Sequence, residues 1–134
     1  MLSPSRMQLL VAEDNAEWRH IIACILEPDC DLAAFVERGD QILEAAQNCG
    51  AELITLDVAM PGESGLNVLP RLREMLPKAI IVIVSSTTTP IYKEEAFARG
   101  ADAYIEKGKV SSDLLATIQA VRARGDQTRG HSNV

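Results

Sequence analysis

Carboxylate, hydroxyl and ammonium side chains stand directly after the apolar segments of this chain. They are Glu13, Asp14, Asp57, Ser85 and Lys107. A group of carboxylates repels itself unless a hard cation binds, and Mg²⁺ suits such a group because it takes a few carboxylates together with waters and phosphate oxygens. An unprotonated aspartate can also act as a nucleophile towards phosphorus and form an acyl phosphate. If the fold brings these side chains together, their types favour phosphoryl transfer.

The residue types also indicate a division of roles. Mg²⁺ held by Glu13, Asp14 and Asp57 would neutralise the phosphoryl oxygens. Lys107 would pair with another of these oxygens, and Ser85 would form a hydrogen bond with the phosphoryl group only when that group is present. A contact that exists only in the modified state is the natural start of a switch.

Each of these residues has a purely structural explanation when it is considered alone. Glu13 and Asp14 could cap the helix that follows them, and Asp57 could belong to the next turn. Ser85 could simply close a strand, and Lys107 could be a solvated surface lysine. Their shared position at the ends of apolar strands favours one site, because ligands of parallel α/β sheets bind at the carboxyl ends of the strands.

The apolar pattern predicts that strands and helices alternate along the chain. The expected strands are 7–12, 31–36, 53–57, 79–84 and 103–106, each followed by a helical pattern. The run 79–84 is apolar at every position, which is typical of a strand with both faces covered, as in a parallel sheet. The sequence therefore predicts a doubly wound α/β domain with helices on both faces of a parallel sheet.

Several residues mark where the helices are expected to begin, end or bend. Asp14 and Glu17 resemble a capping box at the start of the first helix. Ser111 or Ser112 would cap the last one. Pro70 falls inside the third helix, where it removes one backbone hydrogen bond and should kink the helix unless the helix begins at about that residue.

The length of 134 residues suits one domain, which we place at residues 1–124. The segment 125–134 is small and polar without an apolar period, which predicts a flexible tail. This tail leaves no room for a DNA-binding or enzymatic output domain. If the chain is complete, its output must come through contact with another protein; otherwise, the tail could begin a linker.

The composition narrows the expected partners and compartment. The net charge of −6 and the sequence pI of about 4.9 argue against nucleic acid as a direct partner, because phosphate binding needs a basic face. The three cysteines form no CxxC motif, and their odd number without a secretion signal predicts reduced, buried thiols in a cytoplasmic protein. The apolar runs are too short to span a membrane, so we expect no membrane partner.

Four motifs in this order and spacing closely resemble the receiver domain of two-component response regulators, in particular the single-domain chemotaxis type. The motifs are LLVAEDN, LITLDVAMPGESG, IVIVSS and GADAYIEKG, and the match extends over residues 7–124. The resemblance implies a flavodoxin-like fold with five helices and five strands in the order 2-1-3-4-5. It also implies a phosphorylation-controlled switch that is not an enzyme, although it catalyses its own phosphorylation and dephosphorylation.

The resemblance implies a role for each residue of the expected site. Asp57 would accept a phosphoryl group from a histidine kinase or phosphotransfer protein. Glu13, Asp14 and Asp57 would bind Mg²⁺ together with the backbone carbonyl of Ala59. Lys107 takes the place of the phosphate-binding lysine of the family.

The resemblance also implies how the signal leaves the domain. Ser85 and Tyr104 take the places of the switch residues, and Tyr104 would turn inward once Ser85 moves. We therefore expect Tyr104 to lie near Ser85, with Asp57 accessible to solvent. The face formed by the fourth helix, the fifth strand and the fifth helix would contact a downstream protein.

Two alternatives to the phosphorylated switch stay open. One is a degenerate receiver that acts as a docking or dimerisation module without phosphorylation. The other is an aspartyl-nucleophile phosphohydrolase that acts on small molecules. Such enzymes generally need a second acid two residues past the nucleophile, where this chain has Ala59.

Overall fold

The computed structural model describes residues 5–87 and 89–132 of the chain. In this part of the chain five strands alternate with five α-helices, as predicted. The strands are β1 Met7–Ala12, β2 Cys30–Val36, β3 Leu53–Leu56, β4 Ile80–Ser85 and β5 Ala103–Glu106. The helices are α1 Ala16–Leu26, α2 Ile42–Cys49, α3 Gly65–Met75, α4 Pro90–Ala98 and α5 Val110–Ser132.

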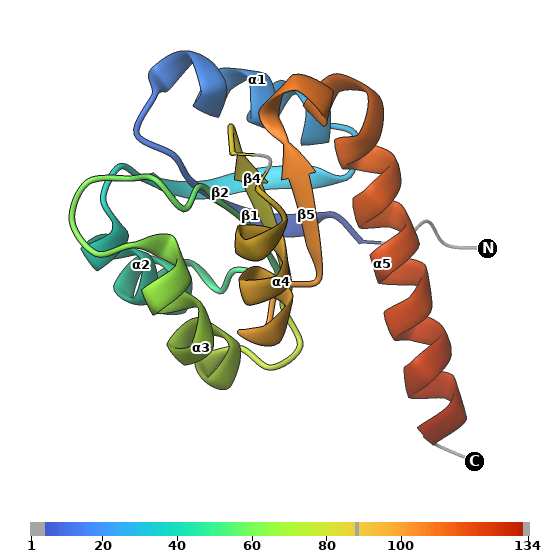
Figure 1. Cartoon of the computed structure of the whole chain (residues 1–134). Helices are drawn as coiled ribbons and strands as arrows, with labels where there is room; N and C mark the ends of the chain where they lie inside the picture. Colours follow the sequence, from blue (N-terminus) through green and yellow to red (C-terminus); the bar gives the residue numbers. More distant parts are fainter. Residues whose placement is uncertain (1–4, 88, 133–134) are drawn as a thin grey trace.

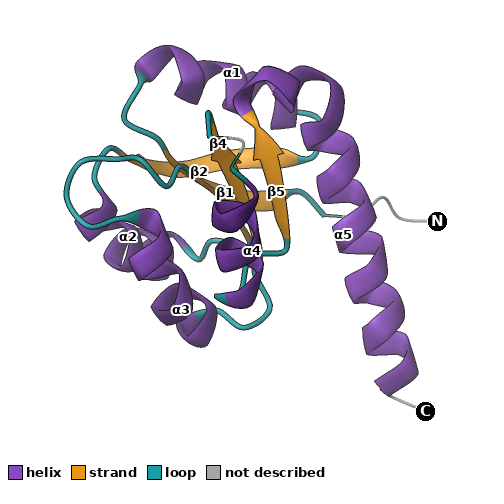
Figure 2. Cartoon of the chain, viewed as in Figure 1, coloured by secondary structure: helices purple, strands orange, loops and turns teal. Residues whose placement is uncertain are grey.

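The strands form one parallel sheet in the order β2-β1-β3-β4-β5, which confirms the predicted fold. Figures 1 and 2 show α1 and α5 on one side of the sheet and α2, α3 and α4 on the other. Because the strand order reverses beside β1, the carboxyl ends of β1 and β3 lie next to each other at the switch point of the sheet.

The central strand β3 is buried on both of its faces. Leu53 packs in the core under α1 and α5, whereas Ile54 and Leu56 pack in the core under α2 and α3. This alternation is the period-two pattern of a strand covered on both sides. As a result, the residue that follows β3 is attached to one of the most firmly packed parts of the domain.

The first residues of α1 and α5 differ from the predicted caps. The N-cap of α1 is Asn15, whose side-chain oxygen accepts a hydrogen bond from the Trp18 backbone nitrogen, so the predicted capping box of Asp14 and Glu17 is wrong. Asn and Asp are comparable N-caps, and propensity alone does not choose between neighbours. The cap at Asn15 leaves the Asp14 carboxylate available for other contacts.

The helix α5 begins before the serines that were predicted to cap it and continues beyond its predicted end. Because a 3-10 turn at Lys107–Lys109 leads directly into Val110, Ser111 and Ser112 lie in its first turn. The segment 125–132 is helical, because an established helix adds one hydrogen bond for each further residue. The flexibility of the tail stays a prediction, and residues 133–134 lie outside the described residues.

None of the helices in the described ranges is long and apolar enough to cross a membrane.

Pro70 lies inside α3 and is tolerated there because another residue replaces the hydrogen bond that it removes. A helical residue at position 70 would donate its N–H to the carbonyl of Leu66, four residues earlier. Proline has no N–H to donate. The guanidinium of Arg99, at the end of α4, donates to this carbonyl instead at 2.9 Å. The proline thus gives α3 a free acceptor to which the end of α4 is attached.

This contact predicts a measurable coupling between Pro70 and Arg99. The change Arg99→Met should lower the free energy of unfolding by about 1–2 kcal/mol, because it leaves the Leu66 carbonyl without its charged donor. In the Pro70→Ala background the loss should be smaller, since the helix itself then supplies a donor. Chemical denaturation of the two single variants and the double variant gives the coupling energy. A coupling of zero would show that Arg99 does not substitute for the missing N–H.

Candidate functional site

The topology brings the predicted site residues to one edge of the sheet. Glu13 follows β1, Asp57 follows β3, Ser85 ends β4 and Lys107 follows β5. All four strands are parallel, so these residues meet at the carboxyl ends of neighbouring strands. The structure therefore places together the residues that the sequence predicts to form one site.

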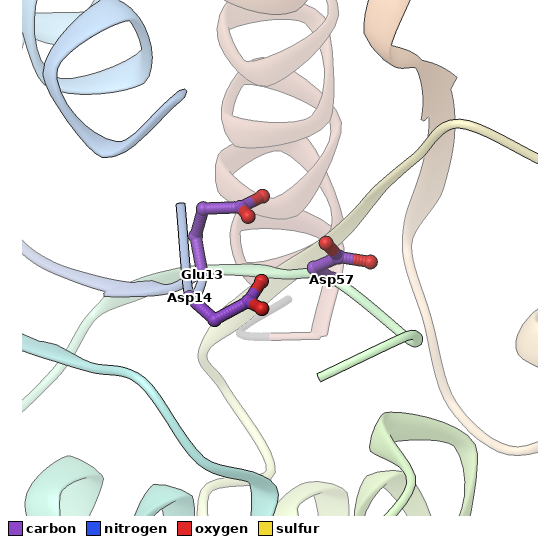
Figure 3. A group of neighbouring side chains, drawn as sticks. All are labelled: Glu13, Asp14 and Asp57. Atoms are coloured by element: carbon purple, nitrogen blue, oxygen red, sulfur yellow. The ribbon is translucent and has the colours of Figure 1, made fainter. Parts of the chain in front are cut away.

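Three carboxylates form a compact acidic cluster at this edge. Glu13, Asp14 and Asp57 each offer one oxygen such that all three oxygens lie within 4.8 Å of one another. Figure 3 shows the carboxylates gathered at the ends of their strands. Glu13 and Asp57 are buried, and Asp14 is exposed. The expectation that Asp57 is accessible to solvent is therefore wrong, since only 5% of the residue is exposed.

The ammonium group of Lys107 bridges the two buried carboxylates. Its Nζ lies 2.8 Å from Glu13 Oε1 and 3.0 Å from Asp57 Oδ2. Burial lowers the pKa of Lys107, but the hydrogen bonds with Glu13 and Asp57 outweigh it, and the net pKa is raised. The lysine is therefore a positively charged counter-ion for both carboxylates.

Burial disfavours the ionised form of Glu13. Burial raises the pKa of its carboxyl group, and the hydrogen bonds from Lys107 and from the Asn15 backbone nitrogen offset this only in part. The nearby charge of Asp57 raises the pKa further. A second positive charge at the cluster would lower the pKa of Glu13, since it would favour the ionised form of the carboxyl group.

Two residues of α1 that the sequence did not indicate contact residues of the site. Arg19 donates to the carbonyl oxygens of Glu13 and Asp14, at 3.1 Å and 3.2 Å, and so holds the backbone of the acidic pair. The ring of Trp18 lies 5.3 Å from Lys107 Nζ, in a cation–π contact. No signal in the sequence links either residue to the site.

The loop after β3 fixes the Asp57 carboxylate by short-range contacts. Asp57 Oδ1 accepts a hydrogen bond from the Ala59 backbone nitrogen at 3.0 Å. A Cβ atom on Gly65 would lie 2.9 Å from the Asp57 carbonyl oxygen, so the start of α3 can approach this closely only with glycine. The role of the Ala59 carbonyl as a metal ligand stays a prediction.

The predicted switch residues are linked through Thr87. Ser85 is buried, and its Oγ accepts a hydrogen bond from the Thr87 backbone nitrogen at 3.1 Å. The hydroxyl of Tyr104 donates to the Thr87 carbonyl oxygen at 2.9 Å. Both side chains therefore hold the same residue of the loop after β4.

The acidic cluster fits Mg²⁺ by the chemistry of its donors. The available ligands are hard carboxylate oxygens on rigid strands, and the cluster includes one exposed member, which leaves room for water. Lys107 supplies one positive charge against three carboxylates, so a divalent cation would balance the remainder. Glu13, Asp14 and Asp57 are thus the side chains that would hold the ion.

Trp18 should report metal binding, because it is the only tryptophan and it contacts Lys107. A cation at Glu13 and Asp57 would shift the ammonium group over the indole ring and change the fluorescence. We expect a saturable change on addition of Mg²⁺, with a half-saturation concentration at least about tenfold higher in Asp14→Asn. The exposed Glu44→Gln is the control. An identical titration of Asp14→Asn would contradict the assignment of this cluster.

The raised pKa of Glu13 predicts how the stability of the metal-free protein depends on pH. The folded chain holds the Glu13 proton more tightly than the unfolded chain, so this contribution to stability is complete below the ordinary glutamate pKa. It is lost as the pH rises through the raised pKa. Relative to Glu13→Gln, the wild type should therefore lose stability as the pH rises above the ordinary glutamate pKa of about 4.3.

Denaturant unfolding in a metal chelator measures this difference at each pH. The exposed Glu44→Gln should follow the wild type throughout. A difference between wild type and Glu13→Gln that is constant, or that changes in the opposite direction, would refute the prediction.

The comparisons with known proteins agree with the geometry. The family model of the response regulator receiver domain matches residues 9–119. The nitrate/nitrite response regulator protein NarL of Escherichia coli K12 is 34% identical over 98 residues, which are 73% of this chain and 45% of that protein. The sensory transduction protein RegX3 of Mycobacterium tuberculosis H37Rv is 30% identical over 117 residues, or 87% of this chain and 51% of RegX3.

A solved structure is also similar. The DNA-binding response regulator of the LuxR family from Staphylococcus aureus superposes with a TM-score of 0.78 at 27% identity, covering 86% of this chain and 98% of that one. The chain spans about half the length of the curated relatives that it matches. The family match covers most of the chain and includes the strands that carry the acidic cluster. The chain therefore belongs to the family of response regulator receiver domains of two-component systems.

Proposed function

We propose that this chain is a signalling switch that accepts a phosphoryl group on Asp57 from a histidine kinase or a phosphotransfer protein. The observation that carries the proposal is the position of Asp57, whose carboxylate lies beside the acidic pair and contacts the ammonium group of Lys107. Such a position surrounds one nucleophilic oxygen with groups that bind a cation and a phosphoryl oxygen.

The proposed reaction follows from the contacts of Asp57. One carboxylate oxygen attacks phosphorus, the bond from phosphorus to the donor breaks, and the donor group leaves with the electron pair of that bond. The Ala59 backbone N–H and Lys107 hold the carboxylate in place for this attack. Lys107 then pairs with a phosphoryl oxygen. Bound Mg²⁺ supplies neutralisation of the phosphoryl charge, and Glu13, Asp14, Asp57 and the Ala59 carbonyl are its proposed ligands.

The proposed switch uses the contacts around Thr87. In the unmodified state the Ser85 hydroxyl accepts from the Thr87 backbone nitrogen. A phosphoryl group on Asp57 would attract this hydroxyl as a donor, and the movement of the Ser85 side chain towards it would break the contact. Movement of Thr87 would release Tyr104, whose hydroxyl donates to the Thr87 carbonyl. The charge on Asp57 is thus converted into a movement of β5 and of the loop before α4.

The proposed output surface is the face of α4, β5 and α5. The helix α4 carries three large apolar side chains that are at least two-fifths exposed, Ile91, Tyr92 and Phe97. Such a group suits a protein partner better than solvent. The net charge of −6 gives no support for nucleic acid as a partner of this chain. The proposed compartment is the cytoplasm, together with the kinase that would supply the phosphoryl group.

Incubation with acetyl phosphate and Mg²⁺, followed by intact mass measurement, tests the proposal. The wild type should gain one phosphoryl group, and Asp57→Asn should gain none. The matched control is Asp31→Asn, which removes an exposed aspartate that is paired with Arg6. Modification of Asp57→Asn to the wild-type extent, or modification that persists in a chelator, would overturn the proposal.

A further inference from the structure

The end of β2 and the turn that follows it are bonded to both sides of the acidic cluster. On one side, the Val36 carbonyl oxygen accepts a hydrogen bond from the Glu13 backbone nitrogen at 3.0 Å. On the other side, Gly39 in the β2–α2 turn donates its backbone N–H to the Pro61 carbonyl oxygen at 3.0 Å. Pro61 lies in the β3–α3 loop, residues 57–64. This part of the chain therefore connects the backbone of the acidic pair with the loop of the nucleophile.

Gly39 approaches the β3–α3 loop more closely than a residue with a side chain could. It is buried, and a Cβ atom on it would overlap with the carbonyl oxygen of Glu63 and lie 2.6 Å from the carbonyl carbon of that residue. Both are backbone atoms, so no side-chain rotation would relieve the overlap. Any residue other than glycine would therefore push the turn and the loop apart.

The β3–α3 loop is the side that would move if Gly39 were larger. The β2–α2 turn is anchored at both of its ends, because Val36 at the end of β2 and Ile42 at the start of α2 are buried. The tip of the loop, at Pro61 and Gly62, is exposed. A substitution at Gly39 should therefore displace the loop outward rather than displace the turn.

Such a displacement would reach the metal-binding side of the site. Ala59 stands two residues before Pro61, and its backbone N–H donates to Asp57 Oδ1 at 3.0 Å. Mg²⁺ requires near-ideal octahedral geometry, with ligands at about 2.0–2.1 Å. A small movement of a backbone that carries a ligand is therefore enough to weaken its binding.

We propose that Gly39 is a positioning residue of the magnesium site, which holds the β3–α3 loop at the distance from the acidic pair that a shared ion requires. The inference rests on the proposed function, because it takes the Ala59 carbonyl as a ligand of the ion. Gly39 does not itself bind the ion. It acts through the close approach of two backbone segments, which only glycine permits.

A purely structural role for Gly39 would give a different result, and a second glycine provides the control. In that case a substitution would lower the stability of the chain but leave the Mg²⁺ affinity of the folded protein unchanged. Gly50, at the end of α2, has a φ of +63°, so alanine there strains the backbone. A Cβ atom on Gly50 would meet nothing within 4 Å in the described part of the chain. Gly50 also precedes β3, at the edge of the sheet opposite to the acidic cluster.

Calorimetric Mg²⁺ titration of the full chain and of Gly39→Ala and Gly50→Ala tests the proposal, after circular dichroism has shown that each is folded. Gly39→Ala should bind Mg²⁺ at least about tenfold more weakly than the wild type, since loss of a residue that supports a metal ligand costs about ten- to a hundredfold in affinity. Gly50→Ala should bind Mg²⁺ as the wild type does. Unchanged affinity in folded Gly39→Ala would overturn the proposal.

Gly62→Ala decides the question if Gly39→Ala does not fold. Gly62 lies in the exposed tip of the same loop with a φ of +82°, and a Cβ atom on it would lie 2.5 Å from Asp40 Oδ1 in the β2–α2 turn. Alanine there disturbs the same contact without entering the core, so it should also weaken Mg²⁺ binding. Wild-type affinity in Gly62→Ala would then overturn the proposal.

Treatment of the same proteins with acetyl phosphate separates this inference from the proposed function. A wild type that binds Mg²⁺ but gains no phosphoryl group would overturn the proposed function, and the Mg²⁺ affinities would still decide the role of Gly39. A wild type that binds no Mg²⁺ would overturn both. A phosphorylated wild type with equal Mg²⁺ affinity in folded Gly39→Ala would overturn this inference alone.

Discussion

The ammonium group of Lys107 between two buried carboxylates is the interaction on which the site depends. Glu13 and Asp57 are almost entirely removed from water, and an unpaired buried charge costs several kcal/mol. Lys107 contacts both of them at hydrogen-bond distance. One lysine therefore pairs with two carboxylates in a place where an unpaired charge would be costly.

This interaction requires a rigid frame, which the sheet provides. Glu13, Asp57 and Lys107 follow three different strands, and each strand is packed in the cores on the two sides of the sheet. Because the charges are attached to packed strands, they cannot separate to relieve their repulsion. Arg19 further restrains the backbone of the acidic pair. The repulsion among the carboxylates that remains is the electrostatic reason why the cluster favours a divalent cation.

The sequence was sufficient to predict the fold and the convergence of these side chains at one edge of the sheet. Alternating apolar runs and helical patterns define five strands, and parallel strands must bring their carboxyl ends together, so the convergence of Glu13, Asp57, Ser85 and Lys107 follows from topology. The family match and the structure confirm the family and the fold. The roles of the individual residues in phosphoryl transfer stay predictions.

Contacts between elements could not be predicted, because one sequence does not fix which long side chain reaches which backbone group. Two contacts are of this kind. Arg19 donates to the backbone of the acidic pair, and Arg99 donates to the carbonyl that Pro70 leaves without its helical donor. The burial of Asp57 depends on Lys107, fifty residues later in the chain. The prediction of buried thiols is wrong at Cys24, whose exposure depends on which face of α1 meets the sheet, and an argument from cysteine count cannot give that.

The Mg²⁺ affinity of Lys107→Met, measured by calorimetry, tests most directly whether this lysine is the counter-ion that a cation must compete with. Removal of a positive charge 2.8 Å from Glu13 should tighten Mg²⁺ binding by about tenfold or more, since a unit charge and a divalent ion a few ångströms apart repel by over 1 kcal/mol even in water. Lys109→Met, on the same turn and exposed, should bind Mg²⁺ like the wild type. Unchanged or weaker binding in Lys107→Met would contradict this account of the site.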